Sequence, residues 1–229
     1  QIKRVYGEPR MNEGSLTTEL SVKILIPARR NSKGVPFKNR KLFKYTANII
    51  PRQYRKSVYV FTDDEVIKGQ VESYGFTNII RNPDSASDES TTKDMMEDFC
   101  SNFPSDNEPI VMLYLTYPRR TWEDVEIAID KFKSLKLGSL LCRKPAKQTP
   151  YLMMFDVGDG LGEQVVKHNL SRRQDYRECF ELCHYISIIL PSELDELNSN
   201  LYNKHTYFMK INETVDVDTP EDMECILKS

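Results

Sequence analysis

The chain lacks three features that would each assign it to a broad class of proteins. Its 229 residues contain 32 Lys and Arg against 34 Asp and Glu, so the net charge is only −2. No overall field therefore attracts nucleic acid or an anionic membrane, and we expect neither partner. No apolar run approaches the roughly 20 residues of a membrane-spanning helix, and the N-terminal residues lack the apolar core of a signal peptide.

Cysteines are few and scattered. The five are Cys100, Cys142, Cys179, Cys183 and Cys225. An odd number without regular spacing is not typical of a disulfide framework, so we expect a reducing compartment and a cytoplasmic location. Cys179, Cys183 and His184 lie close enough together to raise the hypothesis of a zinc site. No second pair at ligand spacing accompanies them, which disfavours zinc.

From residue 22 onward, apolar runs typical of buried strands alternate with helical patterns. We expect strands over 22–26, 58–61, 78–80, 110–115, 139–142 and 185–190, and helices over 64–74, 91–103 and 121–135. This alternation predicts an α/β fold with a mostly parallel sheet covered by helices on both faces.

Two parts of the chain do not follow the alternation. Residues 1–20 are polar and without period, so we interpret them as an N-terminal tail before a single domain over 21–229. Within that domain, residues 143–190 break the rhythm, and Gly158, Gly160 and Gly162 are typical of a hairpin tip. We expect 143–190 to form an inserted, protruding arm.

The most informative segment is the loop over 27–39, directly after the first strand. Its cations are Arg29, Arg30, Lys33 and Lys38. Ligands bind at the carboxyl ends of strands in open α/β sheets. Backbone N–H groups near Gly34, with Lys and Arg as counter-charges, suit a polyphosphate. The alternative is a solvated basic turn.

A second signal is the acidic segment near the C-terminus. In an extended segment, Asp216 and Asp218 point to the same side. Thr219, Pro220 and Asp222 then form a capping box with proline at the first helical position. A carboxylate pair fixed by such a helix start suits Mg²⁺ or Mn²⁺. Alternatively, Asp218 only assists the cap and Asp216 is solvated; beside a phosphate loop, the metal site is favoured.

Two weaker segments also follow strands. Arg81 and the helix start at Ser90 could contact a phosphate or a ribose, or could form a salt-bridged loop and a plain cap. Arg120, in the turn over 114–120, could reach a ligand or form a salt bridge with Glu123 or Asp124. The residues leave both alternatives open.

In order and approximate spacing, these segments resemble the cytidylyltransferases that activate sialic-acid-type sugars, the CMP-sialic acid (acylneuraminate) synthetase family. The resemblance covers about residues 22–228. It is carried by the motifs at 26–39, 61–65, 81–83, 116–120, 173–175 and 215–222.

The resemblance implies a Rossmann-like nucleotidyltransferase fold and the reaction of CTP with a 2-keto sugar acid to give a CMP-sugar and pyrophosphate. It assigns the catalytic residues as Arg29, Lys38, Asp216 and Asp218, with both aspartates also binding the metal. The implied nucleotide-binding residues are Arg29, Asn31, Ser32, Lys33, Asn39, Arg81 and Ser90. Arg173 and Gln174 would bind the sugar acid. A homodimer is also implied, in which the arm reaches the neighbouring subunit.

The chain departs from the family pattern at four places. Arg30-Asn31 stands where small residues are common, and the stretch between Asn39 and Val58 is short. Tyr114 stands where a Gln usually precedes the Thr-Ser-Pro turn. Cys183-His184-Tyr185 replaces Asn-Gly-Ala, a segment that lines the sugar site.

The departures at Tyr114 and at 183–185 motivate an alternative function, a degenerate relative that binds a nucleotide or a partner without turnover. A third hypothesis is a nucleotide-sugar glycosyltransferase with an Asp-x-Asp metal site. The position of Asp216-Val217-Asp218 near the end of the chain disfavours it, because such enzymes usually carry that motif in mid-chain.

Overall fold

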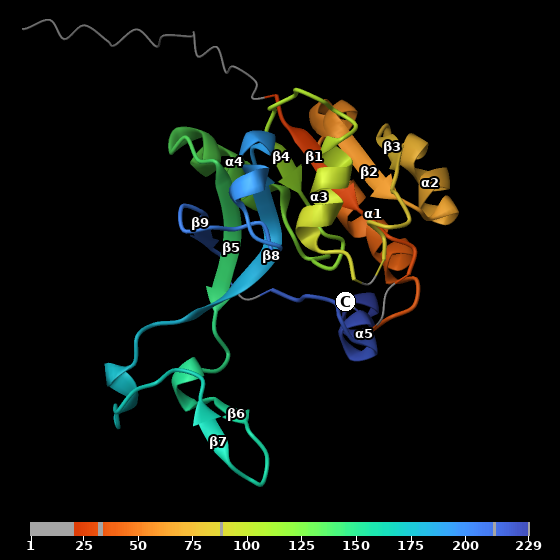
Figure 1. Cartoon of the computed structure of the whole chain (residues 1–229). Helices are drawn as coiled ribbons and strands as arrows, with labels where there is room; N and C mark the ends of the chain where they lie inside the picture. Colours follow the sequence, from red (N-terminus) through yellow and green to blue (C-terminus); the bar gives the residue numbers. More distant parts are fainter. Residues whose placement is uncertain (1–20, 32–33, 88, 213, 229) are drawn as a thin grey trace, which may run out of the picture.

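A seven-stranded sheet forms the centre of the protein (Figure 1). The computed structural model describes residues 21–31, 34–87, 89–212 and 214–228, so the predicted tail over 1–20 lies outside the described residues. The strands are β1 (Lys23–Pro27), β2 (Val58–Thr62), β3 (Thr77–Ile80), β4 (Ile110–Met112), β5 (Ser139–Pro145), β6 (Met154–Asp156), β7 (Gly162–Gln164), β8 (Phe180–Ile189) and β9 (Tyr207–Lys210). The α-helices are α1 (Lys38–Ile49), α2 (Glu65–Val71), α3 (Thr92–Cys100), α4 (Trp122–Ser134) and α5 (Pro220–Leu227). The short 3₁₀ helices are η1 (Arg52–Ser57), η2 (Glu72–Tyr74), η3 (Pro150–Leu152), η4 (Arg173–Asp175) and η5 (Pro191–Glu196).

The sheet is mostly parallel, as predicted. Its strand order is β3-β2-β1-β4-β8-β5-β9. Neighbouring strands run parallel except at β8, which is antiparallel to both β4 and β5. β5 leads into the arm and β8 returns from it, so these neighbours run in opposite directions as the two sides of a long hairpin.

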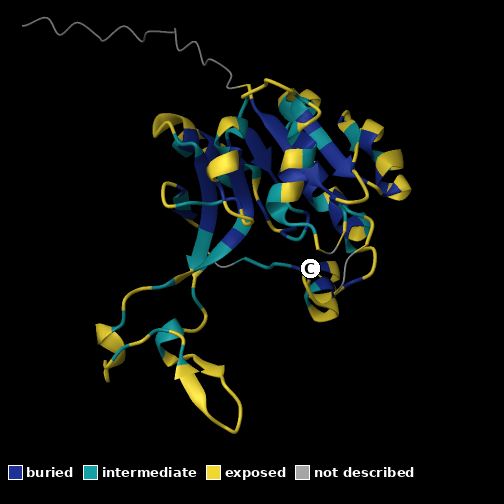
Figure 2. Ribbon diagram, in the orientation of Figure 1, coloured by how far each residue is buried: buried dark blue, intermediate teal, exposed yellow. Residues whose placement is uncertain are grey.

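Helices pack on both faces of the sheet, and β1 shows why. Ile24 and Ile26 belong to a core that includes residues of α1, α2, α4 and α5, whereas Leu25 belongs to a second core with α3 and η5. All three side chains are fully buried, and burying each contributes about 1.5–3 kcal/mol. A strand covered on both sides reads as a continuous apolar run. The predicted α/β class is confirmed, and Figure 2 shows the buried sheet between its helices.

Side-chain caps fix the starts of the helices near the carboxyl edge of the sheet. The predicted capping box is present: the Thr219 hydroxyl accepts a hydrogen bond from the Asp222 N–H, and the Asp222 carboxylate accepts one from the Thr219 N–H. Thr91 and Asp94 form the same arrangement at α3. Each cap satisfies backbone donors that have no partner within the helix, so both helices begin at defined positions.

Strand lengths differ from the prediction at two places. The predicted strand over 110–115 is regular only for Ile110–Met112, after which the chain turns toward α4. β8 begins at Phe180 instead of 185, because its first residues pair with the end of β5 in the stem of the arm. The protruding part is therefore 146–179, while 180–189 lies in the main sheet.

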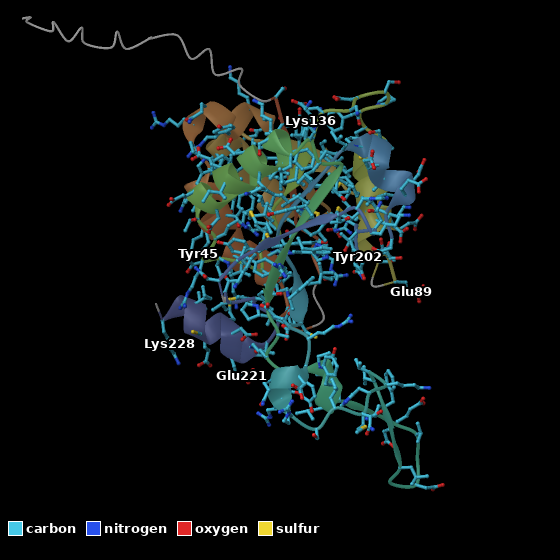
Figure 3. The ribbon with its side chains drawn as sticks, turned by 90° about the vertical axis from the view of Figure 1, so that its left-hand side faces the viewer. Tyr45, Glu89, Lys136, Tyr202, Glu221 and Lys228 are labelled. Carbon is cyan, nitrogen blue, oxygen red and sulfur yellow. The ribbon has the colours of Figure 1, made fainter. Side chains whose placement is uncertain are left out.

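The arm projects from one end of the sheet (Figures 1 and 3). Gly158 and Gly160 have φ angles of 91° and 74° at the tip of the β6–β7 hairpin, and this left-handed region favours glycine. At its base, the rings of Tyr151 and Tyr176 are stacked with centroids 4.8 Å apart, and His168 packs edge-on against both. The arm thus carries its own small aromatic cluster. Within the described ranges, no helix combines the length and the apolar character that crossing a bilayer requires.

Candidate functional site

A cavity of about 360 Å³ opens at the carboxyl edge of the sheet, between the ends of β1 and β4 and the start of α3. Six of the predicted site residues line it: Arg29, Lys38, Asn39, Arg81, Ser90 and Asp218. The remaining lining residues are Pro27, Gly34, Ser87, Thr91, Thr92, Met95, Tyr114, Leu115 and Thr116. We call this space the edge cavity. It brings together residues from widely separated parts of the chain.

Lys38 joins the cationic loop to the acidic segment. It is the first residue of α1, and its Nζ donates to the Val217 carbonyl oxygen at 2.9 Å and to Asp218 Oδ1 at 3.1 Å. The predicted phosphate loop and the predicted metal segment therefore meet at one cavity. Because this ion pair lies at the cavity wall, a charged ligand can separate Lys38 from Asp218 and bind to either of them.

Asn39 and Arg29 shape the loop on the other side of the cavity. Asn39 is buried, and its Nδ2 donates to the Arg29 carbonyl oxygen at 2.9 Å, which fixes the backbone where the loop leaves β1. Arg29 Nη1 donates to the Ser87 carbonyl oxygen at 3.4 Å, so its side chain extends toward the segment before α3. Asn31 is exposed and is not among the lining residues. Ser32 and Lys33 lie outside the described residues.

Arg81 provides a buried cation at the cavity. Only 7% of the residue is exposed, and its guanidinium donates to the Ser85 carbonyl oxygen and lies 5.8 Å from the centroid of the Phe61 ring. Burial lowers the pKa of Arg81 below its usual value. A desolvated guanidinium with no carboxylate within ion-pair distance among the described residues is costly to hold, and an anion in the cavity would offset that cost.

The acidic pair has the alternating exposure that an extended segment requires. Val217 is fully buried, whereas Asp216 is half-buried and Asp218 is exposed. The Val217 N–H donates to the Thr116 carbonyl oxygen at 2.8 Å, which holds the segment against the end of β4. Burial raises the pKa of Asp216, while hydrogen bonds from Tyr117 and Thr116 oppose this rise.

The pair does not serve the helix cap. Asp222, not Asp218, accepts the hydrogen bonds at the start of α5, including one from the Asp218 N–H at 3.1 Å. Asp216 Oδ2 accepts a hydrogen bond of 2.8 Å from the Tyr117 hydroxyl. The alternative of a capping Asp218 beside a solvated Asp216 is therefore not the arrangement observed.

The residues fit Mg²⁺ or Mn²⁺ bound together with phosphates. Asp216 and Asp218 offer hard oxygen donors, and both line a second, larger cavity behind the segment. No group of three Asp, Glu, His or Cys residues in the described ranges could complete a metal site by itself. Mg²⁺ commonly binds one or two carboxylates together with water and substrate phosphates. Cys179, Cys183 and His184 likewise do not form a group that could hold zinc within these ranges.

Arg120 adopts neither of its two predicted roles. Only 2% of the residue is exposed, and it donates to the carbonyl oxygens of Tyr185, at 2.7 Å, and Tyr114, at 2.6 Å. Burial lowers the pKa of Arg120 to about 10. The side chain joins the end of β4 to β8, and this role was not visible in the sequence because its partners are backbone atoms.

Tyr114 lies at the wall of the edge cavity and His184 packs against it, and the chain departs from the family pattern at both residues. Tyr114 lines the edge cavity, and its hydroxyl lies 3.3 Å from Thr92 Oγ1. His184 packs edge-on against the Tyr114 ring with centroids 5.8 Å apart, and its Nδ1 lies 3.1 Å from Ser187 Oγ. Burial lowers the pKa of His184 to about 4, so the ring is neutral near pH 7.

The two predicted sugar-binding residues lie elsewhere in the single chain. Arg173 and Gln174 belong to η4 on the arm, and Arg173 lines a separate cavity of about 510 Å³ with Leu152 and Tyr176. The chain does not bring them to the edge cavity, and their role stays a prediction.

Sequence reasoning missed Tyr117 as the partner of Asp216. It belongs to the turn that follows the strand pattern over 110–115. A polar residue at the carboxyl end of a central strand is a general signal for a site residue.

Two curated proteins show what the sequence is similar to. N-acylneuraminate cytidylyltransferase of Streptococcus agalactiae serotype V is 26% identical over 211 residues, which are 86% of this chain and 50% of that protein. Post-translational flagellin modification protein B of Campylobacter coli is 26% identical over 215 residues, covering 88% and 91% of the two chains. The chain thus spans about half the length of the streptococcal relative. No protein-family profile matches it.

Solved structures share the fold at low sequence identity. CMP:2-keto-3-deoxy-manno-octonic acid synthetase in complex with CTP has a TM-score of 0.62 at 16% identity, covering 90% of this chain and 96% of that one. 4-Diphosphocytidyl-2C-methyl-D-erythritol synthase from Anaerococcus prevotii has a TM-score of 0.57 at 12% identity, with coverages of 91% and 98%. The predicted Rossmann-like fold is confirmed. The resemblance to the acylneuraminate cytidylyltransferases is likewise confirmed, in sequence, by the streptococcal relative.

Proposed function

We propose that the chain is a CTP-dependent cytidylyltransferase that transfers CMP to a 2-keto sugar acid of the sialic-acid type and releases pyrophosphate. The observation that carries the proposal is the 3.1 Å contact between Lys38 and Asp218 at the edge cavity. It joins a cationic loop suited to phosphates with a carboxylate pair suited to a divalent metal. The names of the curated relatives support the same reaction class.

In this proposal, cations of the cavity hold the triphosphate. Arg29 and Arg81 approach it from the β1 loop and the end of β3, and Asn39 and Ser90 contribute polar contacts along the nucleotide. Lys38 leaves Asp218 to support charge on the α-phosphate. A hydroxyl oxygen of the sugar acid forms the new bond to the α-phosphorus and its proton is released to solvent. The bond between the α-phosphorus and the bridging oxygen breaks, and that oxygen leaves as part of pyrophosphate. Positioning and fixed positive charge are the main sources of catalysis in such transfers.

Asp216 and Asp218 would hold Mg²⁺ or Mn²⁺. When bound, this ion supplies positive charge that neutralises the phosphates. Asp218, released from its contact with Lys38, would be one ligand, and Asp216, held by the hydrogen bond from Tyr117, would be the other.

The arm supports a homodimer as the working form. It presents a set of apolar side chains, each more than half exposed: Leu152, Met154, Phe155, Val157 and Leu161. Such a concentration of apolar surface marks an interaction site, and in a dimer Arg173 and Gln174 would approach the partner's cavity. The five cysteines are free, which fits our proposal of a reducing, cytoplasmic location.

The test is pyrophosphate release from CTP with a panel of nonulosonic and octulosonic acids in the presence of Mg²⁺ or Mn²⁺. We expect turnover with at least one acid, and a loss of at least about 100-fold in Asp218→Asn. Asp130→Asn, an exposed aspartate on α4, is the matched control and should retain activity. Absence of turnover over the whole panel would contradict the proposal.

Binding without turnover is the second candidate function, favoured by one observation. Tyr114 lines the edge cavity and His184 packs against its ring, and both residues stand where the chain departs from the family pattern. A rise in melting temperature with CTP, but no pyrophosphate release with any acid, would support this function.

A further inference from the structure

Tyr117 lies directly beneath the carboxylate of Asp216. The residue is only 5% exposed, and its hydroxyl donates to Asp216 Oδ2 at 2.8 Å. Tyr117 comes from the turn after β4, whereas Asp216 comes from the segment before α5. The hydroxyl group therefore links two parts of the site that are 99 residues apart.

Cys183 sets the direction of this hydrogen bond from the other side. It is 2% exposed on β8, and its Sγ donates to the Tyr117 hydroxyl oxygen at 3.6 Å. A tyrosine hydroxyl has one proton to donate and lone pairs that accept. Because the oxygen accepts from the thiol, its proton is directed to the carboxylate. The three residues form a chain that ends at Asp216.

Packing holds the Tyr117 ring in this position. The ring meets that of Tyr185 edge-on, with centroids 5.7 Å apart and an interplanar angle of 83°. The guanidinium of Arg120 lies 5.8 Å from one centroid and 5.5 Å from the other. Arg120 is itself tied to the Tyr185 and Tyr114 carbonyl oxygens. A ring enclosed in this way cannot move its hydroxyl oxygen away from Asp216 without disturbing the core.

Asp216 needs such a support because its own backbone is irregular. Residues 214–218 belong to neither a strand nor a helix, and the Val217 N–H bond to Thr116 is the backbone contact that anchors them. The direction of the Asp216 carboxylate is set by the side chains of Tyr117 and Thr116. A carboxylate has about four lone-pair positions, so these two bonds leave others open toward the adjoining cavity.

We propose that Tyr117, held by Cys183, is a positioning residue that orients Asp216 to bind the divalent metal. The inference rests on the proposed function. Cys183 stands at one of the four departures from the family pattern, where the Asn-Gly-Ala segment has Asn. Hydrogen bonds to metal-binding side chains orient them and strengthen metal binding.

Mn²⁺ binding, followed by the electron paramagnetic resonance signal of the free ion with CTP present, tests the inference. Tyr117→Phe keeps the ring and removes the hydroxyl, and we expect Mn²⁺ to bind between about 10- and 100-fold more weakly. Tyr185→Phe is the matched control. It removes a hydroxyl of the same buried cluster, one that donates to Asp124 at 2.6 Å, and should leave Mn²⁺ affinity within about twofold.

Cys183 provides a second variant that does not touch Asp216. Cys183→Ala should weaken Mn²⁺ binding by about threefold, because it removes a weak donor that acts through one hydroxyl. Cys183→Ser, which retains a donor, should restore the affinity. Circular dichroism and thermal melting establish that each variant is folded.

The outcomes separate the inference from the proposed function. Unchanged Mn²⁺ affinity in folded Tyr117→Phe and Cys183→Ala would overturn the inference and leave the proposed function standing. A wild-type chain that binds neither CTP nor Mn²⁺ with CTP would overturn both.

Discussion

A Cβ atom built on Gly34 would lie 2.1 Å from the carbonyl oxygen of Asp218. Only glycine therefore allows the loop after β1 and the segment before α5 to approach this closely. The same contact places Lys38 within reach of Val217 and Asp218. The edge cavity therefore depends on the close approach of two backbone segments as well as on the Lys38 side chain that joins them.

Gly34→Ala should open this contact. The new methyl group meets a backbone atom, which cannot rotate away as a flexible side chain could, so the two segments must separate. We expect CTP affinity to fall by at least about 10-fold, since misplaced binding groups lose much of their effect. Isothermal titration measures this affinity for CTP.

Gly69→Ala is the control. Gly69 lies within α2, with no atom within 4 Å of an added Cβ, and alanine there should stabilise the fold by up to about 1 kcal/mol. Equal CTP affinity in both variants would show that the close approach is dispensable.

Lys38→Met should reduce turnover far more than stability. The variant removes the cation that we place at the α-phosphate, and we expect kcat/KM to fall by about 100-fold or more, equivalent to roughly 2.7 kcal/mol of transition-state stabilisation. The ion pair with the exposed Asp218 contributes at most about 1 kcal/mol to folding, so the melting temperature should change little. Lys41→Met, an exposed lysine on the same helix, is the control. Similar pyrophosphate release in the two variants would argue against a catalytic Lys38.

His184 should make the fold sensitive to acid. Its pKa is lowered to about 4 by burial, below the ordinary value of about 6.5, so the unfolded chain binds the proton more tightly. The contribution of the neutral His184 ring to the free energy of unfolding is fully present above about pH 6.5 and is lost as the pH falls toward 4. Lowering the pH from 7 to 5 should therefore reduce the free energy of unfolding by about 2 kcal/mol through this residue.

Urea unfolding at the two pH values checks the role of His184. His184→Gln should lose less stability on acidification than the wild type, whereas His205→Gln, at an exposed position, should match the wild type. An unchanged pH dependence in His184→Gln would mean that other groups dominate.

Thr219→Ala should destabilise the start of α5. The hydroxyl accepts the Asp222 N–H at 3.2 Å and donates to Asp222 Oδ2 at 2.9 Å, and losing such a cap costs about 1 kcal/mol. Because α5 anchors the segment that carries Asp216 and Asp218, Mn²⁺ affinity with CTP should fall as well. Thr219→Ser keeps the hydroxyl and should restore both properties. Stability that falls without any change in Mn²⁺ affinity would separate the cap from the metal site.

The parts of the fold that were predictable are those with a local signal. The apolar run at the start of β1 indicated a strand buried on both faces, and Thr219 with Asp222 indicated a capped helix. Both are confirmed, because propensity and capping act between residues that are near in sequence. The boundaries of β8 were less predictable, since its first half is set by pairing with β5 across the stem of the arm.

The site residues also divide into those identified from local sequence and those whose roles depend on distant contacts. Arg29, Lys38 and Asp218 were identified from residue type and position after a strand or before a helix, and they line one cavity. Arg120 and Tyr117 were not assigned their actual roles. Arg120 binds carbonyl oxygens, and backbone partners leave no trace in the sequence pattern. Tyr117 binds a carboxylate 99 residues away, and that pairing depends on where the segment before α5 crosses the end of β4.

The order of amino acids by itself determined which segments become strands and capped helices. It also determined that a cationic loop follows the first strand and that two carboxylates precede the last helix. Only the tertiary structure decided that these groups share a cavity, that Arg120 is part of the core, and that Tyr117 supports Asp216. The physical reason is the distance along the sequence over which each kind of interaction acts. Alternation, capping and turn chemistry are satisfied within a few residues, whereas a contact such as that of Gly34 with Asp218 exists only after the sheet has placed β1 beside β4 and the chain has crossed both.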